Sequence, residues 1–507
     1  MNRVNLAALF CVVPMCIAIS AFVTRPDAVV AAEPPLETRP NIVWIIPDDM
    51  SANFSCYGET AIVTPNVDRL ADEGVKFTRA FVTAPVCSTC RSAFITGMYQ
   101  TSIGAHHHRS GRGAQKIALP ANVKMVPKLF QDAGYHTSIS GWPVNGKLGK
   151  TDYNFAWNPD VYDDNDWSSR AEGQPFFAQI QTQGGKLRGK DAKGWDKTAA
   201  SAKAAYGLPT PIESVRLPPY YPDHPDIVRD WAAYLDSVRL TDMMVGEAIE
   251  RLSAEGVLEN TLVIFMTDHG ISHARGKQFL YDEGIHVPLV IRGPGIEAGS
   301  VREDLVEHID IAAVSLAAAG IEIPSNMQAT NLLASDYKPR KAVFAARDRC
   351  DETVDHIRSV RTQDYKYVRN FLPQRPYLQP CAYKDAKAIL IALRQWHGQG
   401  KLNEVQQLLF QKVRPKEELY DLVIDPYETN NLASDPDESA TLKSMRGMLD
   451  QWMKTTGDQG RQPEPDSMYD SDMEVYLKSL RRKGTDSNLK EVEQNIALMK
   501  QWAADGK

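Results

Sequence analysis

The chain has 507 residues, of which 43% are hydrophobic and 24% are charged, an ordinary balance for a soluble globular enzyme. Its formal net charge of -7 argues against a general nucleic-acid binder, because such proteins carry a basic stripe that neutralises phosphates. An anionic substrate is not excluded, since a local cationic pocket can lie in an acidic protein. The length exceeds one typical domain and predicts a large core domain with a smaller companion.

The first 32 residues have the pattern of an export signal. Arg3 precedes an apolar run from Leu6 to Val23, and the small residues before Glu33 resemble a signal-peptidase site. We therefore expect a signal peptide over residues 1–32 and a mature protein in the periplasm or outside the cell. The alternative is a retained membrane anchor, because the run approaches the length that spans a bilayer, although it contains Pro14.

Apolar strands and helices alternate after the signal. Residues 41–46 form a continuous apolar, β-branched run, the pattern of a strand buried on both faces of a parallel sheet. Thr64 and Pro65 predict a helix start, as N-cap and first-turn proline, and Gly74 predicts its end. Further along we expect strands at 77–83 and 134–140 and a helix at 126–133.

The same alternation continues to the middle of the chain. Residues 151–222 are polar, aromatic and rich in Pro and Gly, so we expect loops around a site, with one strand at 175–180. Residues 226–254 show apolar side chains at helical spacing before Gly256, which predicts a long helix. Residues 261–266 form another buried strand. These elements predict an α/β fold with a mostly parallel sheet flanked by helices.

The last third predicts a separate, smaller unit. Strand patterns occur at 365–369 and 418–425 with a helical pattern at 389–396, so we expect a C-terminal α+β subdomain over residues 341–455. Residues 456–507 are charged and contain Pro and Gly, and we expect this extension to wrap the surface or to be partly disordered.

Two predicted buried strands end in acidic residues. Asp48 and Asp49 follow the first, and Asp268 and His269 follow the strand at 261–266. In open α/β sheets, ligands bind beyond the carboxyl ends of the strands. Adjacent carboxylates suit calcium or magnesium, whereas imidazole is a less typical calcium ligand. Taken alone, the Asp pair fits a solvated turn or a helix cap equally well.

The run Cys87-Ser-Thr-Cys-Arg91, with Gly97 following, is the most informative motif. Its Cys-x-x-Cys core would suit a disulfide or half of a zinc site, but no second Cys-x-x-Cys or His-x-His pair lies at finger spacing. Together with other segments, the run resembles the type I sulfatases of the alkaline phosphatase superfamily in order and spacing. The similar segments are residues 40–49, 64–71, 87–97, 268–288 and 418–432.

Within that family, residues 217–230 look closest to the heparan N-sulfatase (N-sulfoglucosamine sulfohydrolase) branch and related bacterial polysaccharide sulfatases. The resemblance implies an alkaline-phosphatase-like catalytic domain over residues 38–340. It also implies that a maturation enzyme oxidises Cys87 to formylglycine, whose hydrated aldehyde attacks sulfur. Thr89 and Cys90 depart from the usual centre of the modification motif, where the family has Pro or Ala and often Ser.

The family's site residues then fall on particular positions of this chain. The resemblance implies a divalent metal, most favourably Ca²⁺ with Mg²⁺ as the alternative, and residue 87 is expected to touch it as well. Arg91 would stabilise the aldehyde hydrate, and Lys150 and Lys277 would contact sulfate. The implied metal ligands are Asp48, Asp49, Cys87, Asp268 and His269.

Two positions depart from the family in ways that affect proton transfer. Asp152 stands where sulfatases often have His, and Lys186 lies near the place of the His that protonates the leaving group. A lysine needs a depressed pKa to act as an acid at neutral pH, so Lys186 is equally well explained as a charge contact. We predict that His108, or alternatively His106, replaces the missing acid.

Cysteine parity gives weaker information. Of the seven cysteines, two lie in the predicted signal, and the other five become an even number if Cys87 is converted. A Cys350–Cys381 disulfide is one option. A polar group after residue 346 either reaches the cleft or forms structural ion pairs; it consists of Arg347, Arg349, Asp351 and His356.

The sequence therefore predicts a secreted sulfatase that hydrolyses sulfate esters or sulfamates of a sulfated carbohydrate. Its partners would be that carbohydrate and the maturation enzyme, with no nucleic acid, and a membrane only if the signal is retained. The first alternative is a phosphoester or phosphonate hydrolase of the same superfamily. The second is a non-catalytic sulfoglycan-binding protein in which Cys87 stays unmodified.

Overall fold

The computed structural model describes residues 38–484 and 486–507. The predicted signal peptide lies outside these residues, as does the choice between a cleaved signal and an anchor. In the described part of the chain, no helix combines the length and the apolar character needed to cross a membrane. The described residues cluster as one compact unit, so the boundaries expected near residues 340 and 455 stay predictions.

A large mixed sheet forms the core of the described chain. Its strand order is β3-β4-β1-β5-β6-β2-β7, with β8 paired to β2. Strands β3, β4, β1 and β5 run parallel, whereas β6 is antiparallel to both of its neighbours. The bounds are β1 (Asn41–Pro47), β2 (Val75–Phe81), β3 (His136–Gly141), β4 (Phe176–Thr182), β5 (Thr261–Met266), β6 (His286–Arg292), β7 (Ser300–Arg302) and β8 (Val306–Glu307). The predicted α/β class is confirmed.

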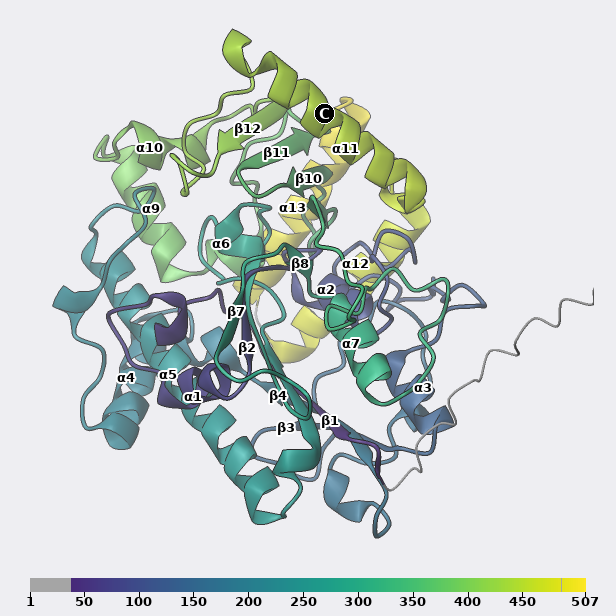
Figure 1. Cartoon of the computed structure of the whole chain (residues 1–507). Helices are drawn as coiled ribbons and strands as arrows, with labels where there is room; N and C mark the ends of the chain where they lie inside the picture. Colours follow the sequence, from purple (N-terminus) through teal and green to yellow (C-terminus); the bar gives the residue numbers. More distant parts are fainter. Residues whose placement is uncertain (1–37, 485) are drawn as a thin grey trace, which may run out of the picture. The chain divides into compact units, whose positions relative to one another are not determined.

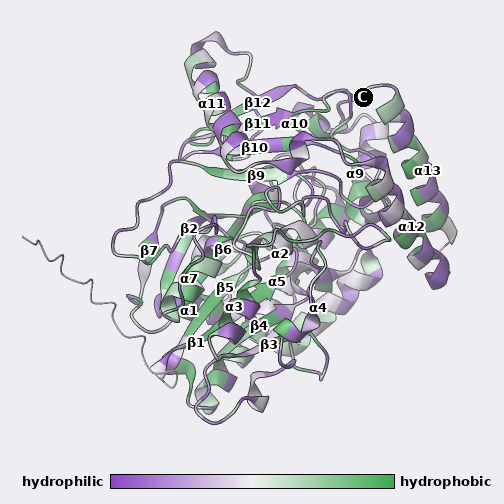
Figure 2. Cartoon of the chain, turned by 90° about the vertical axis from the view of Figure 1, so that its right-hand side faces the viewer, coloured by the Kyte–Doolittle hydropathy of each residue, from purple (hydrophilic) through white to green (hydrophobic). Residues whose placement is uncertain are grey.

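Strand β1 is buried on both faces, as its apolar run predicts. Trp44 and Ile46 belong to a hydrophobic cluster with α2, α3 and α7, whereas Val43 and Ile45 belong to a second cluster with α1 and α5. Figure 2 shows the central strands coloured as hydrophobic between these helices. The bounds are α1 (Pro65–Asp72), α2 (Cys87–Phe94), α3 (Val126–Asp132), α5 (Pro225–Ala254) and α7 (Asp310–Ala318).

Helix α1 begins where the sequence predicts but is capped differently. The hydroxyl of Thr64 makes no capping bond and instead donates to Asp68. The backbone N–H groups of Asn66 and Val67, in the first turn, donate to the carboxylate of Asp242, which comes from α5. Thr64 is therefore the N-cap residue, as the sequence predicts, but a carboxylate distant in sequence, rather than the Thr64 hydroxyl, satisfies the first-turn donors.

A smaller antiparallel sheet has the order β12-β11-β10-β9, with β9 (Val343–Arg347), β10 (Ile357–Arg361), β11 (Tyr365–Asn370) and β12 (Glu417–Asp421). Helix α11 (Ser439–Thr455) packs on this sheet through Leu442, Met445 and Leu449, which join the cluster around Val360 and Leu419. In Figure 1 this sheet and α11 lie at the top of the view, with the large sheet below. The C-terminal strands predicted from the sequence are confirmed.

Two stretches expected to be irregular are helical. Within residues 151–222, the structure has α4 (Ala192–Tyr206), whose N-cap Asp191 accepts from the Gly194 N–H. After residue 455, the chain forms α12 (Asp466–Lys483) and α13 (Asp486–Ala504), which lie side by side in Figure 2. Of the two alternatives expected for this extension, partial disorder is wrong for the described residues, because these helices bury apolar faces against each other and against Ala382.

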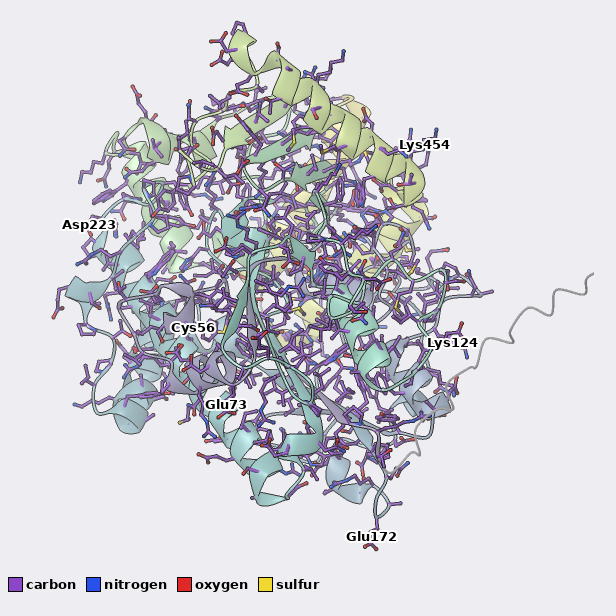
Figure 3. The ribbon with its side chains drawn as sticks, in the orientation of Figure 1. Cys56, Glu73, Lys124, Glu172, Asp223 and Lys454 are labelled. Atoms are coloured by element: carbon purple, nitrogen blue, oxygen red, sulfur yellow. The ribbon has the colours of Figure 1, made fainter. Side chains whose placement is uncertain are left out.

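The remaining helices are short connections around this framework. They are α6 (Asp282–Ile285), α8 (Ala382–Asp385), α9 (Ala388–Gly398) and α10 (Glu404–Gln407). Figure 3 shows charged side chains such as Lys124, Glu172, Asp223 and Lys454 at the edge of the ribbon, where water solvates them. The candidate site, by contrast, is built from buried charges.

Candidate active site

The candidate residues gather at one edge of the large sheet. Asp48 and Asp49 follow β1, Asp268 and His269 follow β5, and Cys87 is the first residue of α2 after β2. Because β1, β5 and β2 point in the same direction, their carboxyl ends meet at this edge. The sheet topology thus brings together residues as distant in sequence as Asp48 and His269.

Glycines allow the loop after β4 to lie directly against the Asp pair. A Cβ on Gly184 would lie 2.2 Å from the Asp48 carbonyl oxygen, and one on Gly185 would lie 2.2 Å from that of Asp49. The Gly185 N–H also donates to the Asp48 carbonyl at 2.9 Å. This close approach carries Lys186, the next residue, over both carboxylates.

The thiol of Cys87 lies among cationic groups. Its Sγ is 3.1 Å from His269 Nε2, 3.2 Å from Lys277 Nζ and 3.8 Å from Lys186 Nζ. Burial raises the pKa of Cys87, but Lys150, Lys186 and Lys277 outweigh it and lower that pKa to about 7. The position therefore favours a negatively charged group.

Arg91 lies one helical turn after Cys87 and is fully buried. Its guanidinium donates to Asp48, to Asp268 Oδ2 at 3.1 Å and to the side chain of Gln181. Its Nε–H has no hydrogen-bond partner among the described residues. Arg91 therefore fixes two carboxylates and keeps one unused buried donor.

A buried set of donor atoms suits a metal ion. Atoms of Asp49, Cys87, Asp268 and His269 all lie within 4.8 Å of one another. Burial lowers the pKa of His269, but Asp268 and Cys87 raise it to about 9, so this imidazole compensates negative charge in the structure. Three hard or borderline ligands in a dry site match the donor set of a divalent cation.

Asp48, the remaining predicted ligand, stands beside this set and is held by cations. Its Oδ2 accepts from Lys150 Nζ at 2.9 Å and from Lys186, while its Oδ1 accepts from Arg91. Burial raises the pKa of Asp48, but Lys150, Arg91 and Lys186 hold it well below the usual value. Asp48 is thus ionised, and its carboxylate pairs with three protein cations in the structure.

The two departures from the family pattern have clear local explanations. Asp152 pairs with Arg112 and with Lys150 at 3.7 Å. Burial raises the pKa of Asp152, but Lys150 and the arginines lower it to about 2, so it holds no proton to donate at neutral pH. Burial lowers the pKa of Lys186, but Asp49, Cys87 and Asp48 raise it above the ordinary lysine value, which favours a charge contact.

His108 contacts the first turn of α2 at Ser88 rather than Cys87 itself. Its Nδ1 is 2.8 Å from Ser88 Oγ and its Nε2 is 3.7 Å from Asp351. Burial and nearby cations, Arg109 first among them, lower its pKa well below the ordinary value, so it is neutral at pH 7. The predicted role of His108 as the acid stays a prediction, and this geometry favours a positioning role.

Two of the polar residues singled out after residue 346 form ion pairs away from Cys87, whereas Asp351 lies 3.4 Å from Arg109. Arg349 donates to Glu464 and to Asp472 of α12, and Arg347 lies 3.1 Å from Asp355. Cys350 and Cys381 are free thiols in the structure, and both accept from the Gln278 amide.

A cavity beside the cluster reveals residues that sequence patterns did not identify. It has a volume of about 380 Å³, and its lining includes Asp49, Lys186, Tyr383, Tyr476 and Asn488. The Tyr383 hydroxyl lies 3.5 Å from Asp49 Oδ2 and 3.3 Å from Ser272 Oγ. No local motif marks these residues, because the C-terminal chain reaches the cavity only through the tertiary fold.

This arrangement defines a class of protein before any comparison is made: a hydrolase of anionic esters with a nucleophile at a helix start and a metal-type carboxylate cluster. The sulfatase family model matches residues 40–321, and a model of the C-terminal region of N-sulphoglucosamine sulphohydrolase matches residues 269–378. The chain belongs to the sulfatase family.

Two curated relatives cover most of the chain. An ulvan-active sulfatase of Formosa agariphila is 32% identical over 474 residues, covering 86% of this chain and 78% of the relative. Human N-sulphoglucosamine sulphohydrolase is 27% identical over 467 residues, covering 82% of this chain and 90% of the relative.

The same fold occurs in a solved phosphonate monoester hydrolase of Agrobacterium radiobacter. Its TM-score is 0.57 at 18% identity, with 82% of this chain and 96% of that chain covered. Solved sulfatase structures superpose with similar scores of 0.56 and 0.60. The fold is therefore shared by both hydrolase types.

Proposed function

We propose that the protein is an exported sulfatase that hydrolyses sulfate esters or sulfamates of a sulfated carbohydrate, with a formylglycine made from Cys87 as its nucleophile. The observation that carries the proposal is the placement of Cys87 at the start of α2 between Lys186 and Lys277. Preorganised cations in a buried site stabilise the charge that develops on the oxygens of a sulfate group. The substrates named for the ulvan-active and N-sulphoglucosamine relatives support a sulfated carbohydrate.

The surroundings of residue 87 fit the modified side chain. A hydrated formylglycine supplies one hydroxyl that attacks sulfur and a second that lets the enzyme release sulfate, an exit that an ordinary Cys or Ser lacks. Those hydroxyls need donors and acceptors, and the unused Nε–H of Arg91 lies one turn away. Thr89 fits inside α2, where its hydroxyl donates to the Val86 carbonyl at 2.9 Å.

The residues of this chain divide the remaining work. Lys277 and Lys186 face the reacting position and would bind the sulfate oxygens. Arg91 and Lys150 hold Asp48 in place from opposite sides. Burial of the whole cluster strengthens each of these contacts, because the effective dielectric constant is lower than in water.

Asp48, Asp49, Asp268 and His269 would hold the divalent cation, with residue 87 beside them. We infer calcium rather than magnesium, because Ca²⁺ tolerates irregular coordination by several carboxylates, whereas Mg²⁺ demands near-ideal octahedral geometry. When bound, such a cation polarises a sulfate oxygen as a Lewis acid. The carboxylates contribute the negative charge that makes the site selective for a cation.

Export and maturation complete the proposal. The N-terminal pattern before residue 33 supports a cleaved signal, and a formylglycine-generating enzyme would act on the segment around Cys87. N-terminal sequencing of the mature protein tests the cleavage. A chain that begins at Met1 in the native host would contradict export by this signal.

Mass spectrometry of the tryptic peptide 80–91 tests the nucleophile directly. We expect the mass of the aldehyde form at residue 87 after expression in the native host, together with turnover of 4-nitrophenyl sulfate well above that of a 4-nitrophenyl phosphonate. An intact thiol with no turnover would favour the sulfoglycan-binding alternative. A preference for the phosphonate would favour the phospho-hydrolase alternative, whose fold this chain shares.

A further inference from the structure

The cavity beside the candidate site is closed on one side by the C-terminal helices. Tyr476 of α12 and Asn488 of α13 line it together with Lys186 and Tyr383. Its volume of about 380 Å³ is at the lower end of the range for small-molecule sites, which runs from roughly 300 to 1,000 Å³. The matched family models end at residue 378, so this wall lies outside them.

The helical wall is anchored firmly enough to shape a binding site. Glu352 accepts from the Asn495 amide at 2.9 Å and from the Ala382 N–H at 2.7 Å, and its carbonyl accepts from the Tyr469 hydroxyl at 2.8 Å. The cluster of Ala382, Leu480 and Val492 adds an apolar contact between α8, α12 and α13. Tyr476 is therefore presented on a packed helix pair.

The charges around the cavity are mostly committed to protein partners. Lys186 contacts Asp48, Arg188 contacts Asp230 at 3.2 Å, and Lys387 donates to the Ser272 carbonyl at 2.9 Å. Lys190 also lines the cavity, is exposed, and forms no side-chain ion pair within the described residues. Apart from Lys186, which is assigned to the scissile sulfate, the Lys190 ammonium group is thus available to a ligand at the cavity.

We propose that α12 and α13, together with Lys190, form a subsite that binds a second anionic group on the substrate's sugar, either another sulfate or a carboxylate. This inference rests on the proposed function, because the scissile sulfate places the sugar in the cavity. Tyr476 offers an aromatic surface to the sugar ring, and Asn488 offers an amide that both donates and accepts hydrogen bonds. Lys190 attracts the second anion as a point charge.

Binding measurements test the subsite separately from catalysis. Calorimetry on a Cys87→Ala background would compare defined heparan and chondroitin oligosaccharides that differ only in one additional sulfate. In at least one pair, we expect the additional sulfate to tighten binding about fivefold, as a partly exposed charge contact does, and Lys190→Gln to abolish that gain. Lys193→Gln, an exposed lysine on α4 outside the cavity, is the matched control and should keep the gain.

The contribution of the Tyr476 ring is tested with two further variants. Tyr476→Leu should weaken binding of both members of a pair, whereas Tyr476→Phe, which keeps the ring, should retain most of the affinity. Equal affinity for both members of every pair, or a gain that survives Lys190→Gln, overturns the proposal. Hydrolysis of 4-nitrophenyl sulfate by the protein with Cys87 intact is measured in parallel, so a failed proposed function appears there and not in the binding data.

Discussion

Lys277 shows how one buried cation connects the ligand cluster with the nucleophile. Its Nζ lies 3.1 Å from Asp49 Oδ1 and 3.2 Å from Cys87 Sγ. Burial alone would lower its pKa, but Asp49 and Cys87 raise that pKa well above the usual value, so Lys277 stays charged at any working pH. A permanently charged group at this place suits an anionic substrate better than a group that loses its charge in the working pH range.

We therefore predict that Lys277→Met lowers kcat for sulfate-ester hydrolysis by about 10²–10³-fold, the usual cost of removing one donor to a developing oxyanion. Steady-state kinetics check this result. Lys454→Met, at an exposed lysine on α11 labelled in Figure 3, is the control and should leave kcat within twofold of the parent. A Lys277 variant with parental kcat would show that this ammonium group does not contact the transition state.

Asp152 gives a residue-scale prediction about pH. Its pKa of about 2 in the folded protein lies below the unfolded value of about 3.9. Its stabilising contribution is therefore complete above the unfolded pKa and is lost as the pH falls toward the folded pKa. Between pH 5 and pH 3, this linkage removes about 1 kcal/mol from the free energy of unfolding.

Urea unfolding of the parent and of Asp152→Asn at both pH values tests this linkage. The parent should lose about 1 kcal/mol more than the variant between pH 5 and pH 3. If both proteins lose the same amount, Asp152 is not ionised through its contacts with Arg112 and Lys150. In that case the protonated carboxyl becomes a candidate acid after all.

At the scale of elements, the start of α1 depends on a residue from α5. Asp242 Oδ1 accepts from the Asn66 N–H at 3.1 Å and from the Val67 N–H at 2.8 Å, and its Oδ2 accepts from the Asn66 amide. Because the carboxylate is buried, Asp242→Ala leaves these donors without partners.

We expect Asp242→Ala to lower the free energy of unfolding by about 2 kcal/mol, near the upper end of N-cap effects. Asp242→Asn keeps one acceptor oxygen and should cost less than half as much. Thr64→Val tests the alternative cap suggested by the sequence. Chemical denaturation should show the Thr64 variant to be milder than Asp242→Ala, and the reverse order would restore the Thr64 hydroxyl as the capping group.

Sequence patterns predict well the elements whose burial can be recognised from their own residues. Strand β5 coincides with the predicted 261–266 because every position after Thr261 is apolar and polar residues flank the strand. Helix α12 was not predicted, because its sequence is rich in charge and its apolar contacts, such as Met473 with Met499, lie on a narrow stripe. Strand β6 was missed as well, because Pro288 interrupts its pattern.

For the whole molecule, local sequence patterns could identify some residues of the candidate site but not those of the adjoining cavity. Asp49 and His269 could be predicted because each follows a recognisable buried strand, and the carboxyl ends of parallel strands meet. Tyr383 and Tyr476 could not, because they reach the cavity through the packing of chain segments that are more than 300 residues from Asp49 in sequence. Local patterns thus locate the chemistry, whereas tertiary packing determines the substrate wall.

The stability of the whole molecule should also depend on whether a cation occupies the carboxylate cluster. Buried carboxylates at Asp48, Asp49 and Asp268 repel one another in one small volume, and a bound cation relieves that repulsion only in the folded state. A ligand at about 100 times its Kd stabilises a protein by about 2.7 kcal/mol, which for a chain of this length is a shift of about 3 °C in Tm. We therefore predict that chelation lowers Tm and that added Ca²⁺ restores it.

Scanning calorimetry with EDTA, and then with excess Ca²⁺ or Mg²⁺, measures the effect. Asp268→Asn should remove most of the Ca²⁺-dependent shift, because it deletes a charge from the centre of the cluster. Glu172→Gln removes an exposed carboxylate at the edge of the molecule and should keep the full shift (Figure 3). A larger shift with Mg²⁺ than with Ca²⁺ would reverse the metal assignment. Equal shifts in both variants would place the stabilising cation outside this cluster, and Lys186 and Lys277 would then be the charges that offset the carboxylates.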